Sequence, residues 1–322
     1  MNLNFKFTLK VINLLLLILV SDTFAQNYPL RSVRIVVPFS PGGGTDYIAR
    51  LIAAKLTALH SQSYIVENRA GAGSSLGTEY VLKSLNDGYI LLLTSGSYTV
   101  APNLYKLRYD PLTDMTPIIQ PDDGPFILVA HPSLPVYSVR EFVDLAKGNP
   151  KKINYASSGV GSISHMSTEL FSMIANIQMT HIPYKGTGQS VVDTVSGHNQ
   201  ILFASSASVV NLIKNNRVRA IAVTSANRVS TIPNIPTFIQ SGYDFKVSNW
   251  HGLIGPKGMT NFTVERLNTD INKIISEPDF TQKISTEGLV AAGGLPEKLQ
   301  KLLIEEISNW RKVSLKVGLL SD

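Results

Sequence analysis

The sequence predicts an α/β fold in which mainly parallel sheets are flanked by helices. Short β-rich runs alternate with segments of helical periodicity between residues 33 and 223, as parallel strands with helical crossovers require. Gly- and Ser-rich loops follow several of the strands, and open α/β sheets bind their ligands at such loops. The chain has 322 residues, which is near the upper limit for a single hydrophobic core, so two lobes are expected.

The first 25 residues have the pattern of a cleaved signal peptide. Lys6 and Lys10 precede an apolar run at residues 11–20, and the small-residue cleavage site ends at Ala25. The run is shorter than the roughly 20 residues that a membrane span needs. The mature chain is therefore expected to begin at Gln26 and to be exported.

Composition favours a protein that binds small molecules and depends on its core for stability. The absence of cysteine excludes disulfides, thiolate metal sites and cysteine nucleophiles. The leader contains two basic residues and one acidic residue, so its removal lowers the formal net charge from +6 to +5. The basic residues are scattered and are not interleaved with aromatics, so no nucleic-acid partner is expected.

Hydrophobic periodicity predicts the elements in order. A strand at residues 33–37 leads through Gly42, Gly43 and Gly44 into a helix at 47–59. Further strands are predicted at residues 63–67, 89–93, 126–130, 153–156, 179–182, 201–204 and 220–223. Further helices are predicted at residues 76–85, 139–147, 163–175, 264–275 and 296–317. The prolines and glycine at 233, 236 and 242 predict an irregular returning segment.

The triple-glycine turn predicts an anion-binding site. Glycine allows backbone N–H groups to converge, and the first turn of a helix adds unpaired donors and the positive end of its dipole. Gly43 is expected at the tightest point of this turn. Asp46 is expected to bond the loop amides and to point away from a bound anion. The serine-rich loop at 157–162 also precedes a predicted helix, and its hydroxyls and amides predict a second anion-binding site.

For any single loop, ordinary turn chemistry and helix capping by Ser or Thr explain the same residues. The case for ligand contact therefore depends on the repetition of such loops along the chain. Small polar groups also follow predicted strands at residues 94–97, 183–189 and 205–208. Phe171, Trp250 and Trp310 are interpreted as aromatics of the core or of the packing between lobes.

Seven motifs run in order along nearly the whole mature chain. They are PFSPGGGTD at 38–46 with Arg50, VENRAGAG at 66–73, DGY at 87–89, YASSG at 155–159, GS at 161–162 with His165, PYKG at 183–186 and PNIPT at 233–237. In order and spacing they resemble the tripartite tricarboxylate transporter substrate-binding family, whose members are also called Bug receptors.

This resemblance implies a class II-like periplasmic binding protein of two α/β lobes. The first lobe would comprise residues 26–125 and 249–322, and the second residues 126–248, with the signal peptide at 1–25. The resemblance implies a small carboxylate held between the lobes and delivered to a tripartite tricarboxylate-type permease of the inner membrane. A monomer without cofactor, metal or catalytic residue is expected.

The ligand-binding residues are expected on loops of both lobes. In this family, the loops that match residues 39–46 and 157–162 grip a ligand carboxylate. The complete set is Phe39, Pro41, Gly42, Gly43, Gly44, Thr45, Asp46, Thr94, Ser97, Ser157, Ser158, Gly159, Ser162, Tyr184, Ser205 and Ser206.

The chain departs from the family at Ala204-Ser205-Ser206, where relatives often carry an aspartate. Its absence favours an acid without an ammonium group. One alternative is a serine hydrolase, because residues 73–77 match G-x-S-x-G, but residues 68–74 separate Ser75 from its strand and a nucleophile elbow follows its strand directly. A second alternative is a receptor that presents its liganded state to a sensor kinase.

Overall fold

The computed structural model describes residues 27–320, so the predicted signal peptide at 1–25 lies outside the described residues. Contacts divide the chain into two units, Met1–Leu30 and Arg31–Asp322. In the first unit, residues 27–30 carry no helix or strand. All elements named below belong to the second unit. Within residues 27–320, no helix has the length and apolar character that crossing a bilayer requires.

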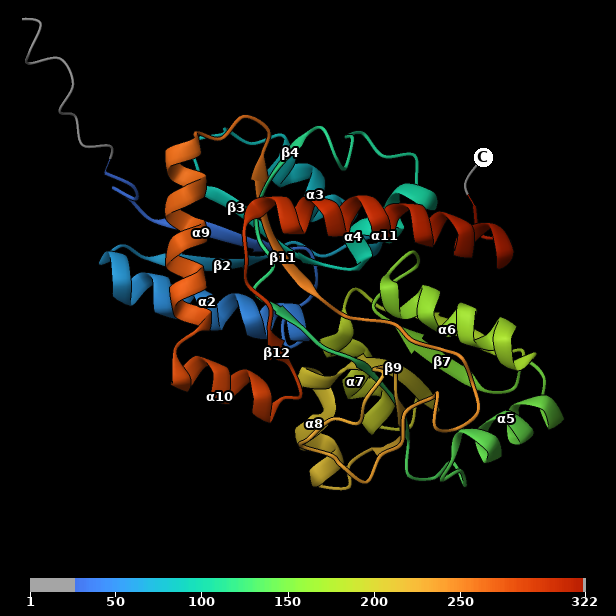
Figure 1. Cartoon of the computed structure of the whole chain (residues 1–322). Helices are drawn as coiled ribbons and strands as arrows, with labels where there is room; N and C mark the ends of the chain where they lie inside the picture. The colour runs from blue at the N-terminus through green and yellow to red at the C-terminus, as the bar shows by residue number, and fades with distance from the viewer. Residues whose placement is uncertain (1–26, 321–322) are drawn as a thin grey trace, which may run out of the picture. The chain divides into compact units, whose positions relative to one another are not determined.

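The first sheet contains five strands in the order β2-β1-β3-β11-β4. Their bounds are β1 Val33–Val37, β2 Tyr64–Asn68, β3 Ile90–Ser95, β4 Met115–Ile119 and β11 His251–Pro256. The helices of this lobe, shown in Figure 1, are α2 Gly44–His60, α3 Ser75–Leu82, α4 Ser97–Val100, α9 Asn261–Ile275, α10 Pro278–Thr286 and α11 Pro296–Lys316, with short 3-10 turns at Ala72–Ser74 and Ala101–Asn103. β1 is a nearly continuous apolar run because it is buried inside the sheet.

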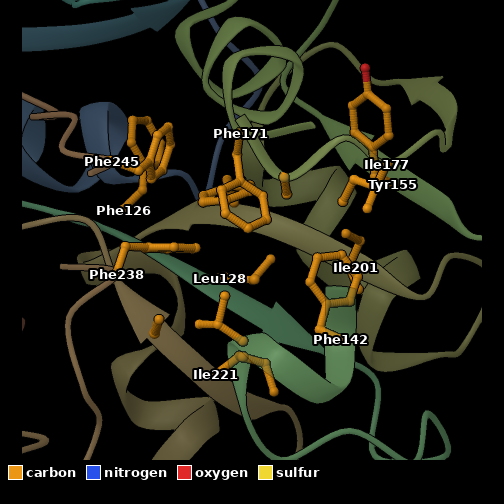
Figure 2. Close-up of a cluster of buried hydrophobic side chains, with 14 of the residues drawn as sticks. Phe126, Leu128, Phe142, Tyr155, Phe171, Ile177, Ile201, Ile221, Phe238 and Phe245 are labelled. Atoms are coloured by element: carbon orange, nitrogen blue, oxygen red, sulfur yellow. The ribbon is translucent and has the colours of Figure 1, made fainter. Parts of the chain in front are cut away.

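The second sheet contains five strands in the order β10-β6-β9-β7-β8. Their bounds are β6 Phe126–Ala130, β7 Asn154–Ser157, β8 Thr180–Pro183, β9 Ile201–Ser205 and β10 Arg219–Val223, and the helices are α5 Val139–Gly148, α6 Ile163–Ala175, α7 Thr187–Val195 and α8 Ser206–Lys214. Figure 2 shows the core of this lobe, where Phe171 lies among other aromatic rings. The ring centroids of Phe171 and Phe238 are 4.8 Å apart, edge to face, which stabilises aromatic pairs.

The predicted α/β, two-lobed fold class is confirmed, but each sheet is less parallel than expected. β1 is parallel to β2 and β3, whereas β11 is antiparallel to both of its neighbours. In the second sheet, β7 is parallel to β8 and β9, whereas β6 is antiparallel to both of its neighbours. β6 is the first strand after the chain passes from the first sheet to the second, and β11 is the first strand after it returns. Both are antiparallel to the strands that helical crossovers connect.

The two crossings between the sheets lie side by side. β5 (Asp122–Asp123) pairs with β12 (Val290–Ala291), and Pro125 forms an antiparallel bridge with Ser248. The Asn249 amide donates to the Gly124 carbonyl at 2.7 Å. We call residues 123–126 and 246–249 the hinge ribbon.

Helix α11 also joins the lobes. Leu299 and Leu303 near its start pack in the core of the first lobe. Trp310 and Val313, further along, pack with the core of the second lobe. The interpretation of Trp310 as an aromatic between lobes agrees with this packing, whereas Trp250 is buried in the core of the first lobe.

Candidate functional site

A small cavity lies between the two lobes. It is lined by Phe39, Gly43, Gly44, Thr45, Asp46, Ser95, Ser97, Phe126, Ser158, Ile163, Thr187, Ser205 and Asn249. Its volume is about 20 Å³, enough for about one water molecule. The lining is rich in hydroxyls and small residues because the loops after β1, β3, β7 and β9 meet here.

The N-terminus of α2 faces this cavity with unpaired donors. The Tyr47 amide is the first to bond, to the Gly43 carbonyl at 3.0 Å. No acceptor in residues 27–320 bonds the amides of Gly44, Thr45 or Asp46, and the N-cap residue Gly43 has no side chain to do so. Three N–H groups and the positive end of a 17-residue helix therefore meet in a sheltered space.

Asp46 stabilises this loop, as the sequence predicted. Its Oδ2 accepts from the Gly42 amide at 3.1 Å, and Arg50 binds both carboxylate oxygens at 2.9 Å. Asn68 donates to Asp46 Oδ1 at 2.9 Å and to the Phe39 carbonyl at 3.1 Å. Burial opposes ionisation, but the bonds from Arg50, Gly42 and Asn68 outweigh it and lower the pKa of Asp46 below its usual 3.8.

The serine-rich loop at 157–162 differs from the N-terminus of α2, because side chains of residues 157–165 already bond three of its amides. The amides of Ser158, Gly159 and Gly161 find acceptors within the segment at 2.9–3.3 Å. These acceptors are, in order, Ser164 Oγ, Ser157 Oγ and His165 Nδ1. This loop therefore offers fewer unpaired amides than the N-terminus of α2, and a second anion-binding site there stays a prediction.

The first turn of α6 is likewise capped. Ser162 Oγ accepts from the His165 amide, and Ser97 Oγ accepts from the Ile163 amide at 3.0 Å. Because Ser97 belongs to the first lobe, this bond crosses between the lobes. For Ser162, the capping alternative that the sequence left open describes the structure.

Two histidines lie beneath the second loop in a stack with Tyr155. The ring centroids of His165 and His181 are 4.1 Å apart, and those of His181 and Tyr155 are 4.8 Å apart. His181 Nε2 shares a 2.6 Å hydrogen bond with Ser157 Oγ. Burial lowers the pKa of His165 to about 4, and burial together with the charge of His165 lowers the pKa of His181 to about 3. Both rings are therefore neutral near pH 7.

The lobes touch closely around the cavity. An ideal Cβ on Gly44 would lie 2.7 Å from Ser205 Oγ, and one on Gly188 would lie 2.2 Å from the Pro41 carbonyl oxygen. At Gly43 the nearest atom would be 3.5 Å away, which is an ordinary contact. The expectation that Gly43 is the tightest point is therefore wrong, since Gly44 faces the opposite lobe directly.

A larger cavity of about 300 Å³ adjoins the first and shares Phe39 and Ser158 with it. Its other lining residues are Pro38, Gly71, Ala72, Gly73, Ser74, Tyr105, Gly159, Val160, Pro183, Tyr184 and Lys185. Tyr105 of the first lobe donates its hydroxyl to the Val160 carbonyl of the second at 2.7 Å. We call this the outer cavity.

Half of the residues predicted from the sequence meet in the interlobe cavity. These are Phe39, Gly43, Gly44, Thr45, Asp46, Ser97, Ser158 and Ser205. Gly159 and Tyr184 line the outer cavity. The remaining predicted residues lie outside both linings and are Pro41, Gly42, Thr94, Ser157, Ser162 and Ser206.

Sequence reasoning did not include five of the lining residues. Ser95 and Thr187 stood inside loops that the pattern had identified, whereas Phe126 and Ile163 looked like core positions. Asn249 is placed by the return crossing, and no local pattern marks it. The roles of Arg50 and Asn68 were also missed, although Asp and Arg four residues apart on a helix indicate an ion pair.

The alternatives of metal binding and hydrolysis gain no support. Residues 27–320 contain no cluster of three or more potential metal ligands. Ser75, the serine of the G-x-S-x-G match, opens α3, and its hydroxyl donates to the Ala72 carbonyl at 2.8 Å. The Ser75 hydroxyl is therefore hydrogen-bonded within its own turn.

Comparison with known proteins identifies the class. Residues 48–319 match the model of the tripartite tricarboxylate transporter family receptor, and the chain belongs to this family of periplasmic solute-binding proteins. Protein BugT of Bordetella pertussis is 33% identical over 298 residues, which cover 91% of each chain.

Solved structures show the same fold. The structure described as R. palustris Rpa4515 with adipate has a TM-score of 0.89 at 32% identity and covers 91% of this chain and 99% of the other. MatC (Rpa3494) from Rhodopseudomonas palustris with bound malate has a TM-score of 0.84 at 28% identity. The match covers 89% of this chain and 99% of the other.

Proposed function

We propose that this protein captures a small carboxylate between its lobes and delivers it to a tripartite tricarboxylate-type transporter from the periplasm. The observation that carries the proposal is the N-terminus of α2. Its amides at Gly44, Thr45 and Asp46 have no acceptor among the described residues, and all three residues line a cavity between the lobes. A carboxylate group supplies the acceptors that this arrangement needs.

Hydroxyls of both lobes complete the proposed carboxylate site. Ser158 and Ser205 come from the second lobe and Thr45 from the first, and all three line the cavity. Hydrogen bonds to a charged group contribute about 1.5 to 3 kcal/mol each, so four or five donors contribute roughly 6 to 15 kcal/mol, against an association cost of about 4 to 15 kcal/mol. Donors at the strong end of this range, in a preorganised site, leave the roughly 8 kcal/mol of micromolar binding without a cationic side chain at the carboxylate.

The outer cavity accommodates the rest of the ligand. The inner cavity has a volume of about 20 Å³ and the outer one about 300 Å³, so a chain of several carbons extends past Phe39 and Ser158. Adipate and malate in the two similar structures are dicarboxylates. Lys185 lines the outer cavity and offers a positive charge to a second carboxylate.

A binding role rather than an enzymatic one agrees with the chemistry of the site. The lining residues offer hydroxyls, amides and one carboxylate, that of Asp46. Arg50 and Asn68 donate hydrogen bonds to this carboxylate. The two neutral histidines lie below the second loop and do not line the cavity. The family consists of binding proteins, and the proposed site needs no cofactor.

A thermal-shift screen of the mature chain, residues 26–322, tests the ligand class. Adipate, malate and other dicarboxylates should raise the melting temperature, because a ligand that binds only the native state stabilises it. Ser205→Asp places a negative charge at the site and should abolish these shifts, whereas the exposed Lys152→Glu should leave them unchanged. If wild-type protein responds to no small carboxylate, the proposal fails. Growth of a gene-deletion strain on the identified acid then tests transport.

A further inference from the structure

A third cavity borders the hinge ribbon and shares no lining residue with the interlobe cavity. Its volume is about 430 Å³, within the range of small-molecule pockets. Gly124, Pro125, Val247 and Ser248 of the hinge ribbon form part of its wall. The next residues along the same two segments, Phe126 and Asn249, line the interlobe cavity. We call this third space the hinge cavity.

Both lobes contribute to the hinge cavity. Residues 225–230 follow β10 of the second lobe, and residues 285–290 connect α10 to β12 of the first. These segments touch, since an ideal Cβ on Gly288 would lie 2.8 Å from Val229 Cγ1. Rotation of the lobes about the hinge ribbon must therefore change the shape of the hinge cavity.

The lining has an apolar floor and a cationic rim. Val229, Val247 and Leu289 are buried and form the floor. Arg228 and Lys246 are exposed at the rim. Arg228 is fixed by its bonds from Nε to Gln240 and from Nη1 to the Pro233 carbonyl, which leave Nη2 without a partner among residues 27–320.

One carboxylate, Asp123, also lines the cavity. Its Oδ1 accepts from the Gly124 amide at 2.7 Å and from the Ser248 hydroxyl. These two neutral donors stabilise the charge of Asp123, and the two cations of the lining, Arg228 and Lys246, outnumber this single acid. An apolar floor with cations at one edge matches a molecule that has an apolar body and one anionic group.

We propose that the hinge cavity is a second binding site, for a small amphipathic anion, and that its occupancy alters the closure of the lobes. The site itself is independent of the proposed carboxylate receptor function, whereas the coupling depends on it. The hinge ribbon forms a wall of both cavities. A ligand in the hinge cavity that prefers one hinge angle must therefore change the affinity of the interlobe cavity for its own ligand. The interlobe ligand must change the affinity of the hinge cavity by the same factor.

A fluorescence titration with 1-anilinonaphthalene-8-sulfonate, an apolar body with one sulfonate, tests the site on the full mature chain. One dye should bind per protein, with affinity reduced at least about tenfold by Ala226→Phe, which fills the cavity, and several-fold by Lys246→Glu. Lys152→Glu, an exposed charge reversal outside the cavity, is the matched control and should bind the dye as wild type does. Absence of saturable binding, or equal affinity in all variants, overturns the site.

The same titration with increasing adipate tests the coupling. The apparent Kd of the dye should change to a plateau while the stoichiometry stays at one, as allosteric linkage requires. A Kd that rises without limit in proportion to adipate means that the dye occupies the interlobe site and contradicts the proposal. An unchanged Kd, in protein whose melting temperature adipate does raise, contradicts the coupling.

Discussion

Asp46 shows how a carboxylate can stand at a helix N-terminus that is proposed to bind an anion. Its side chain is 6% exposed, and Arg50, Asn68 and the Gly42 amide donate hydrogen bonds to its carboxylate. The acid thus shapes the loop so that the next amides point into the cavity. Its position was predictable from the repulsion argument, but its partner Asn68 comes from β2 and is brought close only by the tertiary fold.

Asp46→Ala should lower the free energy of unfolding by about 2 kcal/mol and weaken carboxylate binding at least about tenfold. The physical reason is that three donors lose a buried acceptor and the loop loses its fixed shape. Chemical denaturation and calorimetric titration measure the two effects. Asp144→Ala is the matched control, because Arg140 and Asp144 form an i,i+4 pair whose side chains are 90% and 68% exposed. It should change stability by less than about 0.5 kcal/mol.

The stacked histidines make stability depend on pH. Their folded-state pKa values, about 4 for His165 and about 3 for His181, lie below the usual 6.5. As pH falls through 6.5, the unfolded chain binds protons that the folded chain does not, so stability is lost until pH approaches the folded values. Between pH 7 and pH 5 the loss should be about 2 kcal/mol for His165 and less for the more exposed His181.

Denaturation curves of the double variant His165→Gln/His181→Gln should show a smaller loss of stability between pH 7 and pH 5 than wild type. His198→Gln serves as the control, since the His198 side chain is 71% exposed. A double variant that loses as much stability as wild type over this range would mean that the two rings titrate normally in the folded protein.

At the scale of elements, the N-terminus of α7 tests whether closure is needed for binding. Gly188 lies in α7, and a Cβ there would meet the Pro41 carbonyl of the other lobe at 2.2 Å. Gly188→Ala should therefore oppose closure and weaken carboxylate binding at least about tenfold. It should not unfold its own lobe, because alanine favours a helix over glycine by up to about 1 kcal/mol.

Gly148→Ala is the matched control for Gly188→Ala. Gly148 also lies in a helix, and no atom lies within 4 Å of its ideal Cβ. Both variants should melt cooperatively, and Gly148→Ala should bind carboxylates as wild type does. Unchanged affinity in Gly188→Ala would show that the ligand is held without this contact between the lobes.

Element prediction succeeded where periodicity was strong and failed where tertiary pairing decided the structure. Val33–Val37, Phe126–Ala130 and Ile163–Ala175 were predicted at their observed bounds. β11 was missed because Gly252, Gly255 and Pro256 weaken its strand pattern, and pairing with β3 and β4 stabilises it instead. α8 was interpreted as a serine loop, although Ser206 begins the helix.

At the scale of the molecule, closure brings the donors of the two lobes together. The second lobe adds the hydroxyls of Ser158 and Ser205 to a cavity whose free amides belong to α2 of the first. Under the proposed function, a carboxylate prefers the closed state because only this state offers the donors of both lobes, and it shifts the population toward closure. The lobe boundaries at residues 125/126 and 248/249 remain predictions.

The resemblance of short motifs predicted the class of protein, yet it did not predict the asymmetry of the site. Both loops looked equivalent in sequence, because each joins a strand to a helix through small residues. The difference lies in Ser157, Ser164 and His165, whose side chains bond the amides of the second loop. The direction in which these three side chains point depends on the packed structure, and the spacing of residues in the sequence does not predict it.

We propose that the unpaired amides of α2 hold the ligand carboxylate. A titration of ¹⁵N-labelled mature protein with adipate, followed by amide NMR, observes these amides individually. The amide protons of Gly44, Thr45 and Asp46 should show the largest downfield shifts, because each gains a charged acceptor, while the already bonded amides of Ser158 and Gly159 should move less. Saturable binding with these three resonances unchanged would contradict it.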